Sequence, residues 1–161
     1  MTDKTNNKDK QSFNIVRIYL KDSSFETPSG IEAFKQEWKP NLNIDINTKN
    51  KFVEDDNYEV ELKLTVTVIS DTKTVFIAEV LYAGIFQVKG LDEDSLDKTL
   101  ESYCPTILLP YVRQEISSLS SKGSFPQVLV PPINFDAILV AKKQKKEELI
   151  RNSKENSTLV N

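Results

Sequence analysis

The side chains that most often carry enzyme chemistry are scarce in this sequence. Its 161 residues include no histidine, the commonest general base and a frequent zinc ligand, and a single cysteine, Cys104. A histidine-dependent hydrolytic triad, a structural zinc site and an intrachain disulfide are therefore excluded. We expect Cys104 to be a small buried hydrophobic residue, and a lone cysteine fits a cytosolic protein.

Acidic pairs, glycines and a run of lysines are the other candidates for chemistry. Asp55 with Asp56, and the acidic stretch 92–94, lack the alternate ligand spacing around a glycine that a calcium loop needs, which favours turns and helix caps. The four glycines are too scattered for a phosphate-binding loop. Residues 142–146 are rich in lysine, but Glu147 and Glu148 follow at the spacing of intrahelical ion pairs. We therefore expect no catalytic residue, no metal and no cofactor.

The composition indicates one globular domain of ordinary polarity. Hydrophobic residues make up 39% of the chain, charged residues 28%, and the net charge of −3 argues against a nucleic-acid partner. Neither a signal-peptide core nor an apolar run of 18 residues is found, so we expect a cytoplasmic protein that does not insert into membranes. We expect a single domain over residues 13–150, between a disordered tail at 1–12 and a flexible tail at 151–161.

Four segments have the pattern of β-strands. Residues 13–25 are rich in β-branched and aromatic residues, and residues 58–69 alternate between apolar and polar. Residues 75–88 carry apolar side chains at both odd and even positions. Both faces of that strand should therefore be covered, the second of them by helices or by another subunit. Between residues 26 and 56, prolines and asparagines predict a long irregular connection that contains a short strand at 42–46.

Two later stretches have helical spacing, which makes the fold class α+β. The first, over residues 91–123, carries Pro105 and Pro110, so we expect a kink or two shorter helices. A proline-rich connection follows, and a last helix should run over residues 134–149.

Several large apolar residues stand outside these core patterns. They could pack beneath the long connection, or they could line an open hydrophobic groove that accepts extended, unfolded segments. Such a groove would have little sequence preference, because the hydrophobic effect is non-directional. The residues are Phe34, Trp38, Leu42, Ile44, Ile46, Tyr111 and Phe125.

Four motifs make the sequence resemble the SecB protein-export chaperones. They are RIYLKDSSFETP from residue 17, AGIFQVKG from 83, YCPTILLPYVRQEI from 103 and GSFPQVLVPPINFDA from 123. The resemblance runs from about residue 13 to residue 141. It implies a four-stranded antiparallel sheet with a long crossover connection between its first two strands, two helices, and a homotetramer built as a dimer of dimers. Ala78, Val80 and Tyr82 are expected at an oligomer interface.

The resemblance also implies a function. SecB proteins are ATP-independent holdases that keep unfolded preproteins competent for export and deliver them to the SecA motor. Matching motifs places SecA docking on Asp22, Glu26, Ile77 and Glu79, an acidic surface suited to the basic, zinc-bearing tail of SecA. The client groove implied by the resemblance falls on Trp38, Leu42, Ile44 and Ile46 of the crossover connection and on Tyr111 of the first helix.

Some features depart from the family pattern, and other functions stay open. The chain lacks the acidic C-terminal tail common in the family, and Leu109 and Leu139 stand where aromatic residues are common, so the SecA contact and the groove shape should differ. One alternative is a SecB-like chaperone dedicated to an antitoxin. Another is a carrier of a small hydrophobic ligand, which would need a closed pocket instead of an open channel.

Overall fold

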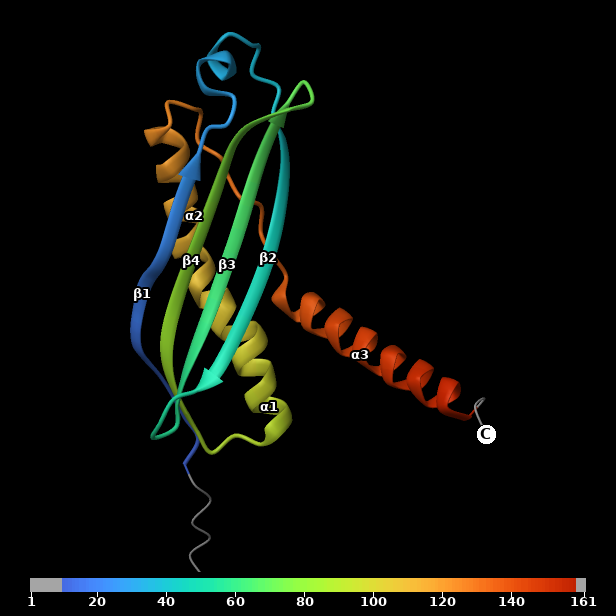
Figure 1. Cartoon of the computed structure of the whole chain (residues 1–161). Helices are drawn as coiled ribbons and strands as arrows, with labels where there is room; N and C mark the ends of the chain where they lie inside the picture. Colours follow the sequence, from blue (N-terminus) through green and yellow to red (C-terminus); the bar gives the residue numbers. More distant parts are fainter. Residues whose placement is uncertain (1–9, 159–161) are drawn as a thin grey trace, which may run out of the picture.

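A four-stranded antiparallel sheet and one long helix form the body of the protein (Figure 1). The computed structural model describes residues 10–158, with side chains described as far as residue 154. The strand order is β1-β4-β3-β2, so the first two strands in the sequence lie at opposite edges. The predicted α+β architecture and the long crossover connection are confirmed.

The strands are longer than the sequence pattern alone indicates. β2 is 12 residues long instead of the five expected, because its polar second half stays paired with β3 as far as Phe52. The irregular crossover connection is correspondingly shorter, and it contains one 3-10 turn, η1 (Gly30–Phe34). The four strands are β1 (Ser12–Glu26), β2 (Asn41–Phe52), β3 (Asn57–Ser70) and β4 (Lys73–Lys89).

Side-chain alternation gives the sheet two different faces. On β3, the apolar residues from Val60 to Val68 are fully buried, while the intervening residues are charged or carry a hydroxyl. α2 lies across β3 and β4 on the apolar side, which we call the inner face. The opposite, outer face carries Ile77, Leu81 and Ile85 of β4, which stay partly exposed in the single chain. The predicted second cover for β4 is therefore absent from the described part of one chain.

The helical path after β4 changes pitch before its first proline. α1 (Glu93–Lys98) leads into a π-helical segment, η2 (Thr99–Tyr103), and then into α2 (Cys104–Lys122). Pro105 lies in the first turn of α2, the position where a missing N–H is best tolerated. Pro110 lies inside α2. The helical path therefore divides into α1 and α2 at the π-helical residues 99–103, before either proline, and Pro110 does not end α2.

α3 (Phe135–Thr158) projects from the body after an extended connection (Figure 1). Asn134 caps it by accepting the N–H of Ala137 at 3.0 Å, and Ser102 Oγ donates to Asp136 at 2.7 Å. The helix runs past the expected end at residue 149, so residues 151–158 of the predicted tail are helical. In the predicted N-terminal tail, residues 10 and 11 are outside any strand or helix, and Ser12 already belongs to β1. Residues 1–9 and 159–161 of the predicted tails lie outside the described residues.

Cys104 is fully buried beside the sheet, which confirms its expected role. Burial raises the pKa of its thiol to about 12, so the reactive thiolate is suppressed at neutral pH. Between residues 10 and 158, no helix is long and apolar enough to span a membrane.

The turn between β3 and β4 holds Thr72 in an unfavourable backbone conformation. Asp71 and Thr72 have φ angles of 46° and 73°, the positive values that a two-residue type I′ turn requires. A β-branched residue is disfavoured there. We expect Thr72→Gly to raise the free energy of unfolding by about 1 kcal/mol, measured by urea denaturation at fixed protein concentration.

The control for this change is Thr67→Gly, in the middle of β3, which should lower the same free energy by about 1 kcal/mol. An equal loss of stability in both variants would show that Thr72 is not strained.

Candidate functional site

An aromatic cluster joins the crossover connection to the end of α2. The ring centroid of Phe125 lies 5.0 Å from that of Phe34 and 5.7 Å from that of Trp38. Phe125 also contacts Phe76 and Phe25. Its side chain is only 6% exposed, whereas Phe34 is 56% exposed. Phe125 therefore supports this apolar surface from beneath, and Phe34 presents a ring to solvent.

The other predicted groove residues on β2 form an open apolar strip. Leu42, Ile44 and Ile46 lie on the inner face, because they pair with buried apolar residues of β3. α2 covers β3 and β4 instead of β2, so Leu42 and Ile46 remain about 40% exposed. We call Leu42, Ile44 and Ile46 the β2 strip. It starts four residues after Trp38, at the end of the sheet that carries the aromatic cluster.

Tyr111 lies apart from the β2 strip. Its ring contacts that of Tyr82 on β4 with centroids 5.7 Å apart, and Tyr82 pairs with Leu20 of β1. Tyr111 therefore packs over β4, and β3 separates β4 from the strand that carries the β2 strip. Within one chain, the predicted groove residues fall into two separate groups.

A hollow of about 760 Å³ lies between α2 and the extended segment that follows it. Its lining is largely polar, with Arg113, Gln114, Ser117 and Lys122 among the residues, and it includes none of the predicted groove residues. A carrier of small hydrophobic ligands would need an enclosed apolar pocket, so this hollow gives no support to that alternative.

The predicted docking residues gather on the outer face. The register pairs Glu26 with Ile77, and Glu79 with Ser24, next to Asp22 along β1. Directly opposite residues have Cβ atoms about 5 Å apart. Asp22 pairs with Leu81 and lies on the same face as Ser24 and Glu26, so three successive pairs of positions bring the four docking residues into one surface. We call Asp22, Glu26, Ile77 and Glu79 the docking surface. It lies on the side of the sheet opposite α2 and the β2 strip.

Glu79 is already held by groups of the same sheet. Lys63 Nζ lies 2.8 Å from Glu79 Oε1, and Thr65 Oγ1 donates to Glu79 Oε2 at 3.2 Å. The hydrogen bond from Lys63 is the main cause of a lowered pKa of the Glu79 carboxyl, and the Thr65 hydroxyl acts in the same direction. Glu79 is therefore ionised and hydrogen-bonded at neutral pH.

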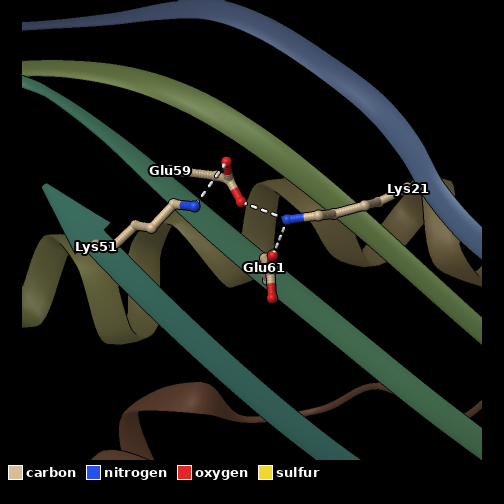
Figure 2. A network of polar contacts seen from close by, with 4 residues as sticks. All are labelled: Lys21, Lys51, Glu59 and Glu61. Carbon is tan, nitrogen blue, oxygen red and sulfur yellow. Dashed lines mark hydrogen bonds and ion pairs between the residues drawn. The ribbon is translucent and has the colours of Figure 1, made fainter. Parts of the chain in front are cut away.

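A second ion-pair network lies on the outer face beside the docking surface, toward the start of β3. Lys21 reaches from β1 across β4 and donates to Glu59 and Glu61 of β3, while Lys51 of β2 lies 3.6 Å from Glu59 (Figure 2). The register of β1 shifts between Leu20 and Asp22, so Lys21 is the extra residue of a β-bulge. These carboxylates raise the pKa of Lys21. The network directs Lys21 toward β3 although Asp22 is its neighbour in sequence.

The residues expected at an oligomer interface lie mostly inside the chain. Ala78 and Val80 are fully buried on the inner face beneath α2, and Tyr82 is half-buried against Tyr111. The assignment of Ala78 and Val80 to a surface between subunits does not fit this packing, whereas an interface role for Tyr82 stays a prediction. Because β4 carries apolar residues on both faces, its sequence pattern could not indicate which face the chain's own helix covers.

Comparison with known proteins identifies the family. A family model described as "Preprotein translocase subunit SecB" matches residues 6–146. The chain belongs to the SecB family. Proteins named protein-export protein SecB are 47% identical over 136 residues in Ectopseudomonas mendocina and 42% identical over 153 residues in Marinobacter nauticus. These alignments cover 84% of both chains in the first case, and 94% of this chain and 93% of the relative in the second.

A solved structure shows the same fold. The SecB-like chaperone of Mycobacterium tuberculosis, in complex with a peptide from an antitoxin, superposes with a TM-score of 0.63 at 14% identity, covering 76% of this chain and 90% of that one. SecB proteins are non-enzymatic export chaperones, so family membership confirms the resemblance and the expectation that the protein is not an enzyme.

Lysines that no sequence motif indicated neutralise part of the outer face of this SecB protein. Glu59, Glu61 and Lys63 occupy alternate positions of β3, and this period could have placed them on one face. The reach of Lys21 could not have been found in this way, because it depends on a bulge and on the strand order.

The central position of Phe125 leads to a test of the aromatic cluster. We expect Phe125→Leu to lower the free energy of unfolding by about 1–2 kcal/mol, because the ring loses contacts with four other aromatic rings. Trp38 is the only tryptophan, so its emission should report the loosened stacking directly.

The control is Phe52→Leu, whose ring is 60% exposed and contacts only Tyr58 among the aromatic residues of the described chain. It should change stability by less than about 0.5 kcal/mol and leave Trp38 emission unaltered. Unchanged stability and emission in Phe125→Leu would remove Phe125 from its supporting role.

Proposed function

We propose that this chain is an ATP-independent holdase that binds unfolded preproteins in the cytoplasm, keeps them competent for export and delivers them to SecA. It acts as a homotetramer and needs no cofactor. The main support is the placement of two different surfaces on one sheet. The inner face has an open apolar margin, and the outer face has an acidic surface, so a client and a motor could be bound at the same time.

The client surface comprises the β2 strip and the exposed part of the aromatic cluster. Both are apolar and partly open, and β2 is an edge strand whose outer backbone groups have no neighbouring strand among residues 10–158. An extended unfolded segment offers apolar side chains and unpaired backbone groups, which such an edge can accept with little sequence preference. Weak contacts of this kind also allow release.

The docking surface suits a basic partner. Asp22 and Glu26 are exposed carboxylates on β1, and Ile77 adds a half-buried apolar contact at the centre. Complementary charge raises the association rate and sets specificity more than it raises affinity. This is the behaviour needed in a partner that must receive clients and then dissociate.

Assembly into a dimer of dimers would cover surfaces that one chain leaves open. β1 is the other edge strand, and Ile15, Val16 and Leu20 are each more than 40% exposed along it. An exposed apolar edge is a template for pairing with another chain. In the tetramer, several client surfaces would hold one long unfolded polypeptide, and the gain comes from multivalency.

A role in general protein export is favoured over that of a chaperone dedicated to a single antitoxin. The relatives named protein-export protein SecB are 42–50% identical, whereas the structure solved with an antitoxin peptide is 14% identical. The much higher sequence identity to the protein-export relatives therefore supports the export role.

Light scattering after size exclusion tests the holdase role. The protein alone should have about four times the 18.3 kDa mass of the chain. After rapid dilution of a denatured preprotein into it, a complex with one preprotein should appear, and the same preprotein added in its folded state should not bind. A monomer that ignores the denatured preprotein would overturn the proposal.

Reciprocal variants separate the two surfaces. Replacing Asp22 and Glu26 with lysine should weaken SecA binding about tenfold or more and leave capture of the denatured preprotein intact, because the changed residues lie on the outer face. Replacing Ile44 and Ile46 with serine should weaken client capture and leave SecA binding intact. If either pair of changes impaired both activities equally in a folded protein, the assignment of separate surfaces would be wrong.

A further inference from the structure

The carboxylates of the docking surface differ in their availability to a partner. Both oxygens of Glu79 are engaged, one by Lys63 and the other by Thr65. Neither Asp22 nor Glu26 forms an ion pair within the described residues, and Lys21, the nearest lysine in sequence to Asp22, is bound to Glu59 and Glu61 instead (Figure 2). A basic partner would therefore meet two free carboxylates and one that is occupied.

Lys63 and Glu79 are diagonal neighbours on adjacent strands, and both side chains lie on the outer face. Lys63 pairs with Leu81 and Thr65 pairs with Glu79, so the lysine is diagonal to the carboxylate on the neighbouring strand. The side chains of Lys63 and Glu79 are 41% and 33% exposed. Water and a competing cation can reach the pair, which makes it displaceable.

We propose that Lys63 is an intramolecular competitor at the docking surface, which occupies Glu79 until a lysine or arginine of the basic partner replaces it. This inference rests on the proposed docking function and adds its regulation. The ammonium group of Lys63 offers Glu79 the same charge and hydrogen bond that a partner's cation would offer. Part of the attraction between the two proteins is therefore used to separate Lys63 from Glu79.

The strength of the Lys63–Glu79 ion pair determines how much the partner's affinity should change when Lys63 is removed. A partly exposed ion pair is worth little in water, so its removal should tighten binding of the partner by about two- to fivefold. Thr65 is not a competitor for charge. Its hydroxyl stays on the second oxygen and orients the carboxylate.

The experiment measures SecA binding by calorimetry for Lys63→Gln beside a matched control, Lys49→Gln. Both changes remove one positive charge from the outer face, but Lys49 lies on β2 opposite Glu61 and forms no ion pair in the part of the chain that the structure describes. Lys63→Gln should bind SecA about two to five times more tightly than the unchanged protein. Lys49→Gln should alter affinity much less, because only screened long-range charge is changed.

A double-mutant cycle tests whether the effect passes through Glu79. In a Glu79→Gln background, Lys63→Gln should lose its tightening effect, because there is no carboxylate left to release. Capture of a denatured preprotein, which uses the inner face, should be the same in all variants and reports correct folding.

Three results would overturn the inference. Equal tightening by Lys63→Gln and Lys49→Gln would mean that long-range charge alone is at work. Weaker binding by Lys63→Gln would mean that Lys63 orients Glu79 for the partner. If Glu79→Gln weakened SecA binding while Lys63→Gln had no effect, docking would stand and the competitor role would fail. Unchanged SecA binding by Glu79→Gln and by the Asp22 and Glu26 variants would instead sink the docking surface itself.

Discussion

The packing of α2 against one face of β3 and β4 is the interaction on which the rest of the structure depends. It buries every second side chain of β3 from Val60 to Val68, which fixes the register of the central strands. Because side chains alternate, the same packing sends Glu59, Glu61 and Lys63 to the outer face. The apolar client surface and the charged docking surface are thus two results of one constraint.

The width of α2 explains where the inner face stays open. A helix with its side chains is about 10–12 Å across, whereas the axes of the outer strands in a four-stranded sheet lie about 14 Å apart, before side chains are added. One helix can cover the two central strands and leaves a margin at each edge. The β2 strip lies in one of these margins, at the edge of the sheet.

Local patterns in the sequence predicted those features that local physics determines. The alternation over residues 58–69 located β3, and Gly123 and Asn134 marked a helix end and a helix start. Sequence could not show which face of β4 the chain's own helix covers, so Ala78 and Val80 were placed at a subunit interface and are buried instead. The length of β2 was missed for a related reason, since its polar second half is held by pairing with β3.

The strand order also has a consequence for how the chain folds. β2, β3 and β4 are joined by short turns and form local hairpins, but β1 must pair with residues far along the chain, from Glu26 with Ile77 to Ser12 with Lys89. Closing such a loop costs entropy before any contact is gained, so we expect β1 to join the sheet late in folding. Until then the edge of β4 would be unprotected, and a newly made chain would pass through a stage in which this holdase is itself a protein with an unpaired strand edge.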